Sequence, residues 1–154
     1  MIRLIVMSDS HGGCYTVGRV LDRHPEAHYV IHLGDGAADL EEFLPTCRAR
    51  VLQVAGNCDF CSHHPNEQEI KIGGVPLFFT HGHAYSVKHG LGRMEAEARR
   101  RGVQLAMFGH THEPVCRYED GLYLFNPGSL RFGSTYGIVD ITDGGIAVNT
   151  ANVY

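Results

Sequence analysis

The chain has 154 residues, 44% of them hydrophobic, which predicts one domain (1–154) able to cover a sheet on both faces. Its formal net charge of -4 leaves no basic face to dock nucleic acid, so none is expected as a partner. The chain opens on a short apolar stretch, which is neither a signal peptide nor a membrane span, so we expect a cytoplasmic protein without a membrane partner. The five scattered cysteines do not describe a secreted disulfide framework.

Strand and helix alternate in the first third of the chain. Apolar runs at 2–7, 28–33 and 50–55 predict strands, and short helices are expected between them at 15–24 and 39–44. This βαβ pattern is typical of parallel strands joined by crossover helices.

The middle of the chain changes character. A polar loop is expected at 60–66, followed by a hairpin of strands 68–72 and 75–80. A helix over 87–101 then leads to a strand at 103–108.

The last third predicts two further hairpins. Their strands are expected at 116–118 with 122–125, and at 136–141 with 146–149. Alternation followed by hairpins favours an α/β fold in which two mixed sheets pack face to face, with helices outside.

Residues of metal-binding type stand where the apolar runs stop, the place where α/β sheets bind ligands. These residues are Asp9, His11, Asp35, Asn57, His81, His110 and His112. A single strand-end aspartate is usually a helix cap, and a single buried histidine usually packs and hydrogen-bonds. Because every such block pairs the polar residue with glycine or a second ligand, we interpret the set as a site for two metal ions.

Two of these blocks carry a pair of donors at alternate positions. Alternate residues of an extended backbone share a face, so Asp9 with His11, and His110 with His112, are each expected to hold one centre. Cys58 and Cys61 form one isolated CxxC, which leaves half of a zinc site or a redox pair as minor alternatives.

The blocks D-x-H, G-D, G-N-x-[DE], H and G-H-x-H occur in that order, and the sequence resembles the calcineurin-like metallophosphoesterases over almost its whole length. The turn Asn126-Pro127-Gly128-Ser129 also looks like the small single-domain bacterial and archaeal phosphodiesterase branch. The resemblance implies a four-layer α/β/β/α sandwich, a dinuclear metal site and phosphoester hydrolysis. It further implies one metal on Asp9, His11 and His112, the other on Asn57, His81 and His110, and Asp35 as the bridge.

The block at Asn57 departs from that family. Many relatives have a histidine where Cys58 stands and use it as general acid, whereas a thiol with an ordinary pKa of about 8.5 is a poor proton donor. A water, or a leaving group that needs no proton, would have to serve. Asp59 is expected to orient an imidazole or the Asn57 amide rather than to bind metal.

Three further residues have open roles. His83 is a candidate for substrate contact, with the pocket rim or a structural role as the alternative. Arg131 has the reach to contact a phosphate, although a surface role is the simpler interpretation. His32, inside a strand, is expected to pack.

Imidazole and amide donors with only two carboxylates favour two divalent transition-metal ions, with manganese first and iron, nickel, cobalt or zinc as alternatives. Such ions, roughly 3.5–4 Å apart, share a water whose hydroxide form is the expected nucleophile. With Asp9 and Asp35 the core then carries about one positive charge, which a phosphodiester monoanion neutralises, and no Lys or Arg cluster stands beside the motifs.

We therefore expect a phosphodiesterase acting on a small phosphoester. The alternatives are a phosphomonoesterase or nucleotide phosphatase, and a non-catalytic scaffold like the retromer subunit that shares this fold. A nuclease fits less well, because the acidic chain has little room for a cap or a basic groove.

Overall fold

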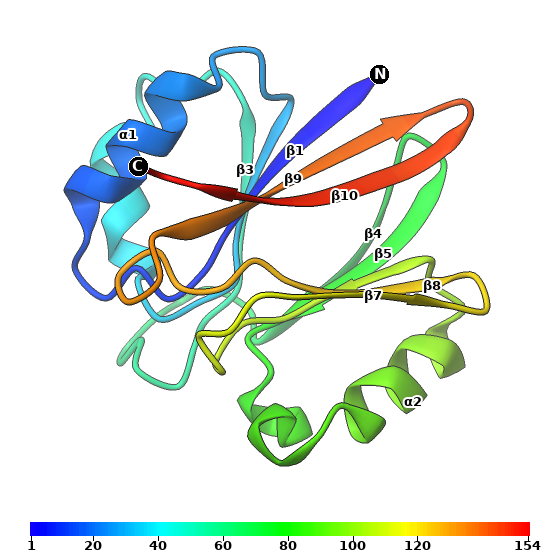
Figure 1. Ribbon diagram of the computed structural model, residues 1–154. Helices are drawn as coiled ribbons and strands as arrows, with labels where there is room; N and C mark the ends of the chain where they lie inside the picture. The colour runs from blue at the N-terminus through cyan, green and yellow to red at the C-terminus, as the bar shows by residue number, and fades with distance from the viewer.

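The computed structural model describes residues 1–154 and places two five-stranded sheets face to face (Figure 1). The strands of the first sheet, in spatial order, are β10 (Gly145–Asn152), β9 (Thr135–Thr142), β1 (Ile2–Met7), β2 (Tyr29–His32) and β3 (Arg50–Gln53). Those of the second sheet are β4 (Glu67–Ile72), β5 (Val75–Thr80), β6 (Leu105–Met107), β8 (Leu122–Asn126) and β7 (Val115–Glu119).

Helices cover the outer faces of both sheets, which gives the expected α/β/β/α layers (Figure 1). Helix α1 (Cys14–Arg23) and the 3-10 helix η1 (Ala37–Phe43) pack on the first sheet. Helix α2 (Gly92–Arg101) covers the second, after two single-turn 3-10 helices, η2 (His83–Tyr85) and η3 (Val87–His89). None of these helices combines the length and the apolar character that a membrane crossing requires.

Each sheet contains three neighbouring parallel strands. In the first sheet β1, β2 and β3 run parallel, and in the second β5, β6 and β8 do so. The antiparallel strands β9, β10, β4 and β7 lie outside these triplets. Parallel strands end at the same edge of a sheet, so the loops that follow the six parallel strands can meet along one rim.

The sequence of β1 shows how the layers are held together. Leu4 and Val6 point into the core between the sheets, whereas Ile5 and Met7 point toward α1. Successive side chains of a strand face opposite sides, so a strand covered on both faces is apolar throughout. All four side chains are fully buried.

The three hairpins are confirmed, but two expected helices are wrong in part. The helix over 87–101 is interrupted, because Gly90 has a φ of 133°, which a helix cannot contain, and α2 begins only at Gly92. The helix at 39–44 is instead η1, which begins at Ala37 and has 3-10 geometry. Helix α2 ends at Arg101, as expected, and Gly102 follows it with left-handed backbone.

Replacing Gly137 with alanine should destabilise the sandwich. A Cβ at Gly137 in β9 would lie 2.4 Å from Cε2 of the buried Phe125, so the core would be overpacked, at a cost of about 1–3 kcal/mol. Urea unfolding measures this change. The control is Gly144→Ala, where the nearest atom is 3.7 Å away, and equal midpoints for the two variants would contradict the packing described.

Candidate metal centre

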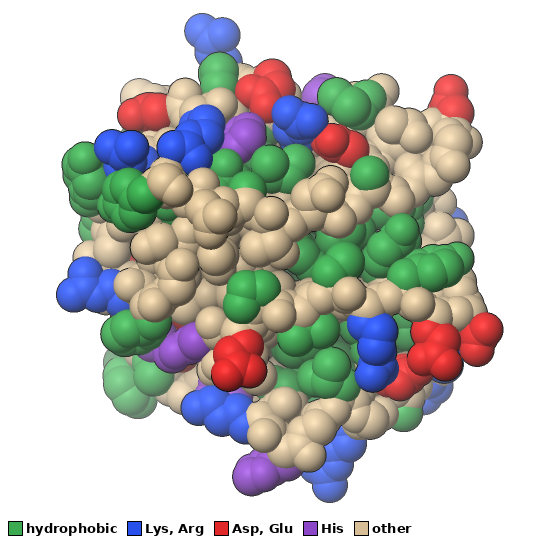
Figure 2. Space-filling model, viewed as in Figure 1, with side chains coloured by type: hydrophobic (Ala, Val, Ile, Leu, Met, Phe, Trp, Pro, Cys, Tyr) green, Lys and Arg blue, Asp and Glu red, His purple; other side chains and the backbone are tan.

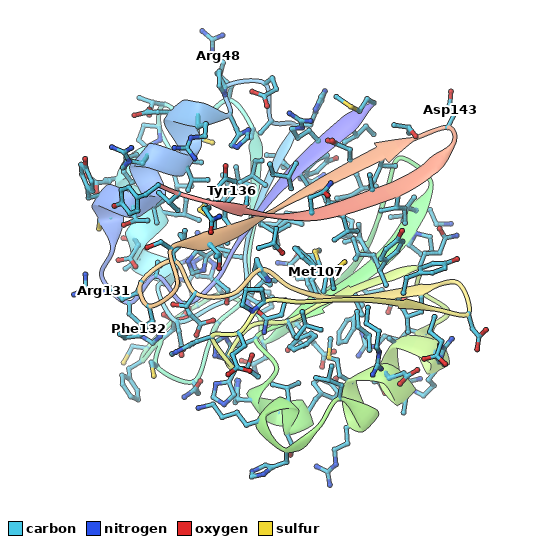
Figure 3. All side chains as sticks on the ribbon, viewed as in Figure 1. Arg48, Met107, Arg131, Phe132, Tyr136 and Asp143 are labelled. Carbon is cyan, nitrogen blue, oxygen red and sulfur yellow. The ribbon has the colours of Figure 1, made fainter.

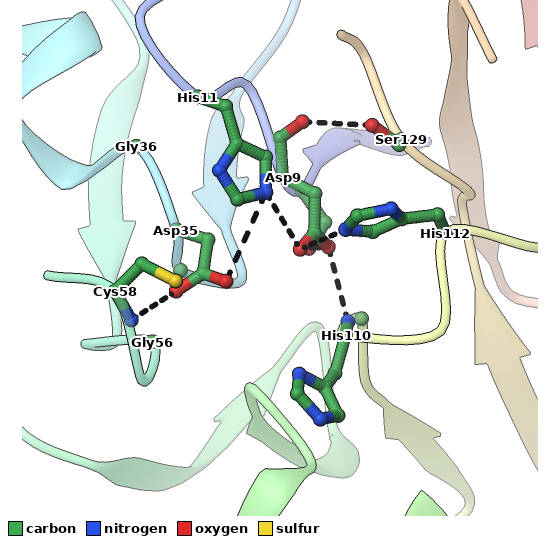
Figure 4. A network of polar contacts seen from close by, with 12 residues as sticks. Asp9, His11, Asp35, Gly36, Gly56, Cys58, His110, His112 and Ser129 are labelled. Carbon is green, nitrogen blue, oxygen red and sulfur yellow. Dashed lines mark hydrogen bonds and ion pairs between the residues drawn. The ribbon is translucent and has the colours of Figure 1, made fainter. Parts of the chain in front are cut away.

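The polar residues that follow the strands converge on the rim where the parallel strands end (Figure 4). They form two groups, in each of which the candidate ligand atoms lie within 4.8 Å of one another. The first group is Asp9, His11 and His112, and the second group is Asp35, His81 and His110. Each group draws on both sheets, so the rim joins them.

Asp35 lies between the two groups. Its Oδ2 is 3.2 Å from Nε2 of His81 in the second group and 3.8 Å from Nε2 of His11 in the first. Nε2 of His81 in turn lies 3.9 Å from Oδ1 of Asp9. The donors therefore face one shared space, and the carboxylate of Asp35 lies between the two groups.

Asp9 and His11 share the first group, as expected, but the structure corrects the expectation that His110 and His112 hold one centre. His110 and His112 belong to different groups. Both have left-handed backbone, with φ values of 67° and 64°, so the rule for alternate residues of an extended chain does not apply. The amide of Asn57 contacts its neighbour instead, with Nδ2 3.6 Å from Sγ of Cys58. The assignment of Asn57 to the second group therefore stays a prediction.

Left-handed backbone is a shared property of the site. Asp9, His11 and Asp35 have φ values of 54°, 42° and 56° and so join His110 and His112 in this region. L-residues rarely adopt it, and such strain tends to gather at functional sites. Five of the six side chains in the two groups are thus placed by unusual backbone.

Glycine is required where loops press on the carboxylates. A Cβ at Gly56 would lie 2.1 Å from Oδ1 of Asp35, and one at Gly109 would lie 2.0 Å from Oγ of Ser8. Both distances are far below contact, so a larger residue would displace a loop that carries a candidate ligand.

Asp9 is the most heavily bonded member. Its Oδ2 accepts hydrogen bonds from Oγ of Ser8 at 2.5 Å and from the backbone N–H of His110 at 3.0 Å (Figure 4). Its Oδ1 lies 3.1 Å from Nε2 of His112. The Oγ of Ser129 donates to its backbone carbonyl at 2.8 Å. Side chain and main chain of Asp9 therefore both link β1 to the second sheet and the loop after β8.

Asp59 accepts hydrogen bonds from backbone N–H groups, which corrects its expected role. Its oxygens accept hydrogen bonds from the backbone N–H groups of Asp35 (2.7 Å), Gly36 (2.9 Å), Ala37 (3.1 Å) and Gly56 (2.7 Å). Burial alone would raise its pKa, but these donors outweigh it and lower the pKa. Asp59 orients neither an imidazole nor the Asn57 amide; it fixes the loop that carries Asp35.

The pKa shifts in the second group favour the binding of a cation. Burial opposes ionisation of Asp35 and protonation of His81, but their mutual contact, aided by the Cys58 N–H at 2.7 Å, lowers the pKa of Asp35 and raises that of His81. The Nδ1–H of His81 donates to the Leu33 carbonyl at 2.8 Å, which leaves Nε2 to face the group. Burial, His81 and Lys88 lower the pKa of His110 to about 4, which favours the neutral imidazole that metals bind.

The donor set fits the two ions that the fold family implies. Nε2 of His11 is buried but has no hydrogen-bond partner. Buried polar atoms without a partner are rare, and a ligated ion would supply one. Two carboxylates with four imidazoles match the preferences of divalent transition metals.

The remaining predicted residues surround this space. His83 is exposed, and its ring centroid lies 5.5 Å from that of His81 and 6.1 Å from that of His110. Partial burial and His81 lower its pKa. Cys58 is exposed, and burial and Asp35 raise the pKa of its thiol. Arg131 is exposed and forms no ion pair.

Two supporting residues escaped sequence reasoning in their roles. Nδ2 of Asn126 donates to the carbonyl of Gly109 and to Oγ1 of Thr111, both at 3.0 Å, so it anchors the loop of His110 and His112. Its position at the end of β8, where another apolar run stops, was the available signal.

His32 does more than pack. Its Nδ1 accepts the Gly34 N–H at 3.1 Å, and its Nε2 lies 2.9 Å from Oγ of Ser10, which donates to Oδ2 of Asp39 at 2.6 Å. His32 thereby ties the loop of Asp9 to the loop of Asp35. Burial lowers its pKa to about 4.

Comparison with known proteins agrees with this geometry. Residues 2–144 match the model of the calcineurin-like phosphoesterase superfamily domain. The chain belongs to this superfamily. It is 31% identical over 131 residues to the probable metallophosphoesterase YsnB of Bacillus subtilis, covering 84% of this chain and 76% of YsnB.

Other members of this superfamily cover nearly the whole chain. Phosphodiesterase YfcE of Escherichia coli K12 is 28% identical, covering 91% of this chain and 88% of YfcE. A crystal structure of a predicted phosphoesterase from Streptococcus pneumoniae superposes with a TM-score of 0.84 at 26% identity, covering 99% of this chain and 90% of that one. The chain is thus a metallophosphoesterase of the small bacterial and archaeal branch.

Replacing Asp59 with asparagine should weaken metal binding by about 10- to 100-fold, because the loop of Asp35 loses a charged acceptor of four hydrogen bonds. Competition with a chelator measures the affinity. Asp143→Asn at the tip of the distant β9–β10 hairpin (Figure 3) is the matched control. Equal affinity of the two variants would show that the Asp59 clamp does not support the centre.

Protonation of His32 should destabilise the metal-free protein in acid. Its folded pKa of about 4 lies below the ordinary histidine pKa of about 6.5, so the neutral form stabilises the fold above pH 6.5 and this contribution is lost as pH falls toward 4. His32→Gln should flatten the fall of unfolding free energy over this range, measured by urea titration at several pH values. Parallel pH profiles for variant and wild type would contradict the assignment.

Proposed function

We propose that this chain is a phosphodiesterase that works with two divalent transition-metal ions. The observation that carries the proposal is the pair of adjoining groups with Asp35 between them and the unpartnered Nε2 of His11 facing both carboxylates. In this proposal Asp9, His11 and His112 hold one ion, while His81, His110 and Asn57 hold the other. Asp35 lies between the two ions in this proposal, which completes the seven ligands named from the sequence.

Bound ions would polarise the phosphoryl oxygen and lower the pKa of a coordinated water, which is the chemistry this fold family needs. Other residues of the chain hold the proposed ligands in place. His81 is held with Nε2 forward by the Leu33 carbonyl, and Asp59 holds the loop of Asp35. His83, exposed beside the second group, is our candidate for contact with the substrate.

Charge favours a diester as substrate. Four neutral imidazoles and two carboxylates would leave two dications with an excess of about two positive charges, which falls further when a coordinated water ionises. A diester monoanion matches the remaining positive charge better than a monoester dianion does. Lys88 is one cation near His110 that the sequence did not reveal, and it is the observation in favour of the monoesterase alternative.

Protonation of the leaving group has no assigned side chain. Cys58 lies beside Asp35, but its raised pKa and weak S–H donor make it a poor acid. We therefore propose that the best substrates are diesters whose leaving group departs without a proton, such as aryl esters. Manganese is the ion we propose, with iron, nickel, cobalt and zinc as alternatives.

Hydrolysis of bis(p-nitrophenyl) phosphate by metal-depleted protein, with each ion restored separately, tests the proposal. Activity should return with manganese and exceed that on p-nitrophenyl phosphate. A chain that hydrolyses neither ester with any ion, while it binds metal, would be a scaffold instead.

Asp35→Ala should lower kcat by at least about 100-fold, because it removes the side chain placed between both groups. Cys58→Ala should leave kcat nearly unchanged, although the backbone N–H of Cys58 contacts Asp35. Steady-state rates with the metal content of each variant measured in parallel decide this. A Cys58→Ala variant as impaired as Asp35→Ala, with its metal intact, would make the thiol the acid.

A further inference from the structure

An exposed aromatic ring lies directly on the candidate metal ligands. The Phe132 side chain is 67% exposed and belongs to none of the three apolar cores. Its ring stacks on the imidazole of His112, with centroids 5.1 Å apart and planes 24° from parallel, and it lies 5.4 Å from the ring of His11. Folding does not explain a large apolar side chain left in solvent at this place.

The ring is held in register with the first group. The backbone N–H of Phe132 donates to Oγ of Ser129 at 3.0 Å, and that hydroxyl donates to the carbonyl of Asp9 at 2.8 Å. The N–H of Gly133 donates to the Ser129 carbonyl at 3.0 Å. Phe132 thus sits on a turn that is bonded to the loop of Asp9, at the edge of the rim (Figure 3).

The geometry suits a planar partner. One face of the ring already covers His112 in a nearly parallel stack, while most of the side chain remains open to solvent. Aromatic rings pair well in such offset stacks, and aromatic side chains bind bases of any sequence through their faces. The ring offers no hydrogen bonds, so it would select a ring rather than a particular substituent.

We propose that Phe132 is a specificity-determining residue that stacks on an aromatic group carried by the non-leaving ester arm of the substrate. This inference rests on the proposed phosphodiesterase function. The group is a nucleobase or an aryl ring, which share the planar face that Phe132 recognises.

Three diesters with the same leaving group, p-nitrophenolate, test the inference. They carry methyl, phenyl or 5′-thymidyl as the other arm, so the ratio of kcat/KM to the methyl ester isolates the contribution of that arm. Wild type should prefer at least one aromatic arm by about 5- to 150-fold. The preference for phenyl or thymidyl tells which ring is the partner.

Phe132→Leu should bring that ratio close to one, mainly through a higher KM for the ester with the aromatic arm, and the metal content of the variant is measured in parallel. Phe132→Tyr keeps an aromatic face and should retain the ratio. Phe60→Leu is the matched control, because Phe60 is also exposed (85%) but follows Asp59 on another loop.

Three results would overturn the inference: a wild-type ratio near one, a ratio unchanged in Phe132→Leu, or an equal loss on all three esters together with loss of metal. The last would mean that the ring only supports His112. A wild type that cleaves the methyl ester but shows no preference removes the inference and keeps the proposed function. Failure to cleave any of the three esters with any ion removes both.

Discussion

The carboxylate of Asp9 has no exposed surface, and the arrangement of the rim depends on it. It follows β1 of the first sheet, yet it binds the backbone of His110 and lies beside His112 of the second. A buried carboxylate is costly unless charge and hydrogen bonds compensate it. Ser8 Oγ and the His110 N–H donate to the Asp9 carboxylate, and Ser129 Oγ donates to the Asp9 carbonyl. Nε2 of His11, beside Asp9, has no hydrogen-bond partner, and a cation at this place would supply the missing compensation.

Strain at this rim is balanced by anchors from distant parts of the chain. The left-handed positions would be unfavourable for free loops, and bonds to other segments hold several of them: the N–H groups of Asp9, His11 and His110 donate to Gly34, Asp35 and Asp9. Asp59 gathers the loop of Asp35, His32 joins that loop to Ser10, and Asn126 fixes the loop after β6. Preorganisation of this kind places ligands before any ion arrives, so a metal meets a site that needs little rearrangement.

Much of the fold and of the candidate site could be predicted, because strands are recognisable in the sequence as apolar runs that end at polar residues. The layers, the hairpins and the convergence of Asp9, Asp35 and His81 follow from that pattern. The separation of His110 from His112 is implied by the family resemblance but not by the rule for alternate residues of an extended chain, since tertiary contacts impose their left-handed backbone. Contacts across the chain, such as Asp59 with residues more than twenty positions earlier, leave no local signal either.

We propose that the convergent side chains form one site for two ions, bridged by Asp35. Elemental analysis of the metal-depleted chain, reconstituted with manganese and passed through a desalting column, measures the stoichiometry directly. We expect about two ions per chain, because the two groups adjoin and each presents three candidate ligands within 4.8 Å of one another. A stoichiometry that stays at one ion or at none with manganese and with each alternative ion would contradict the account.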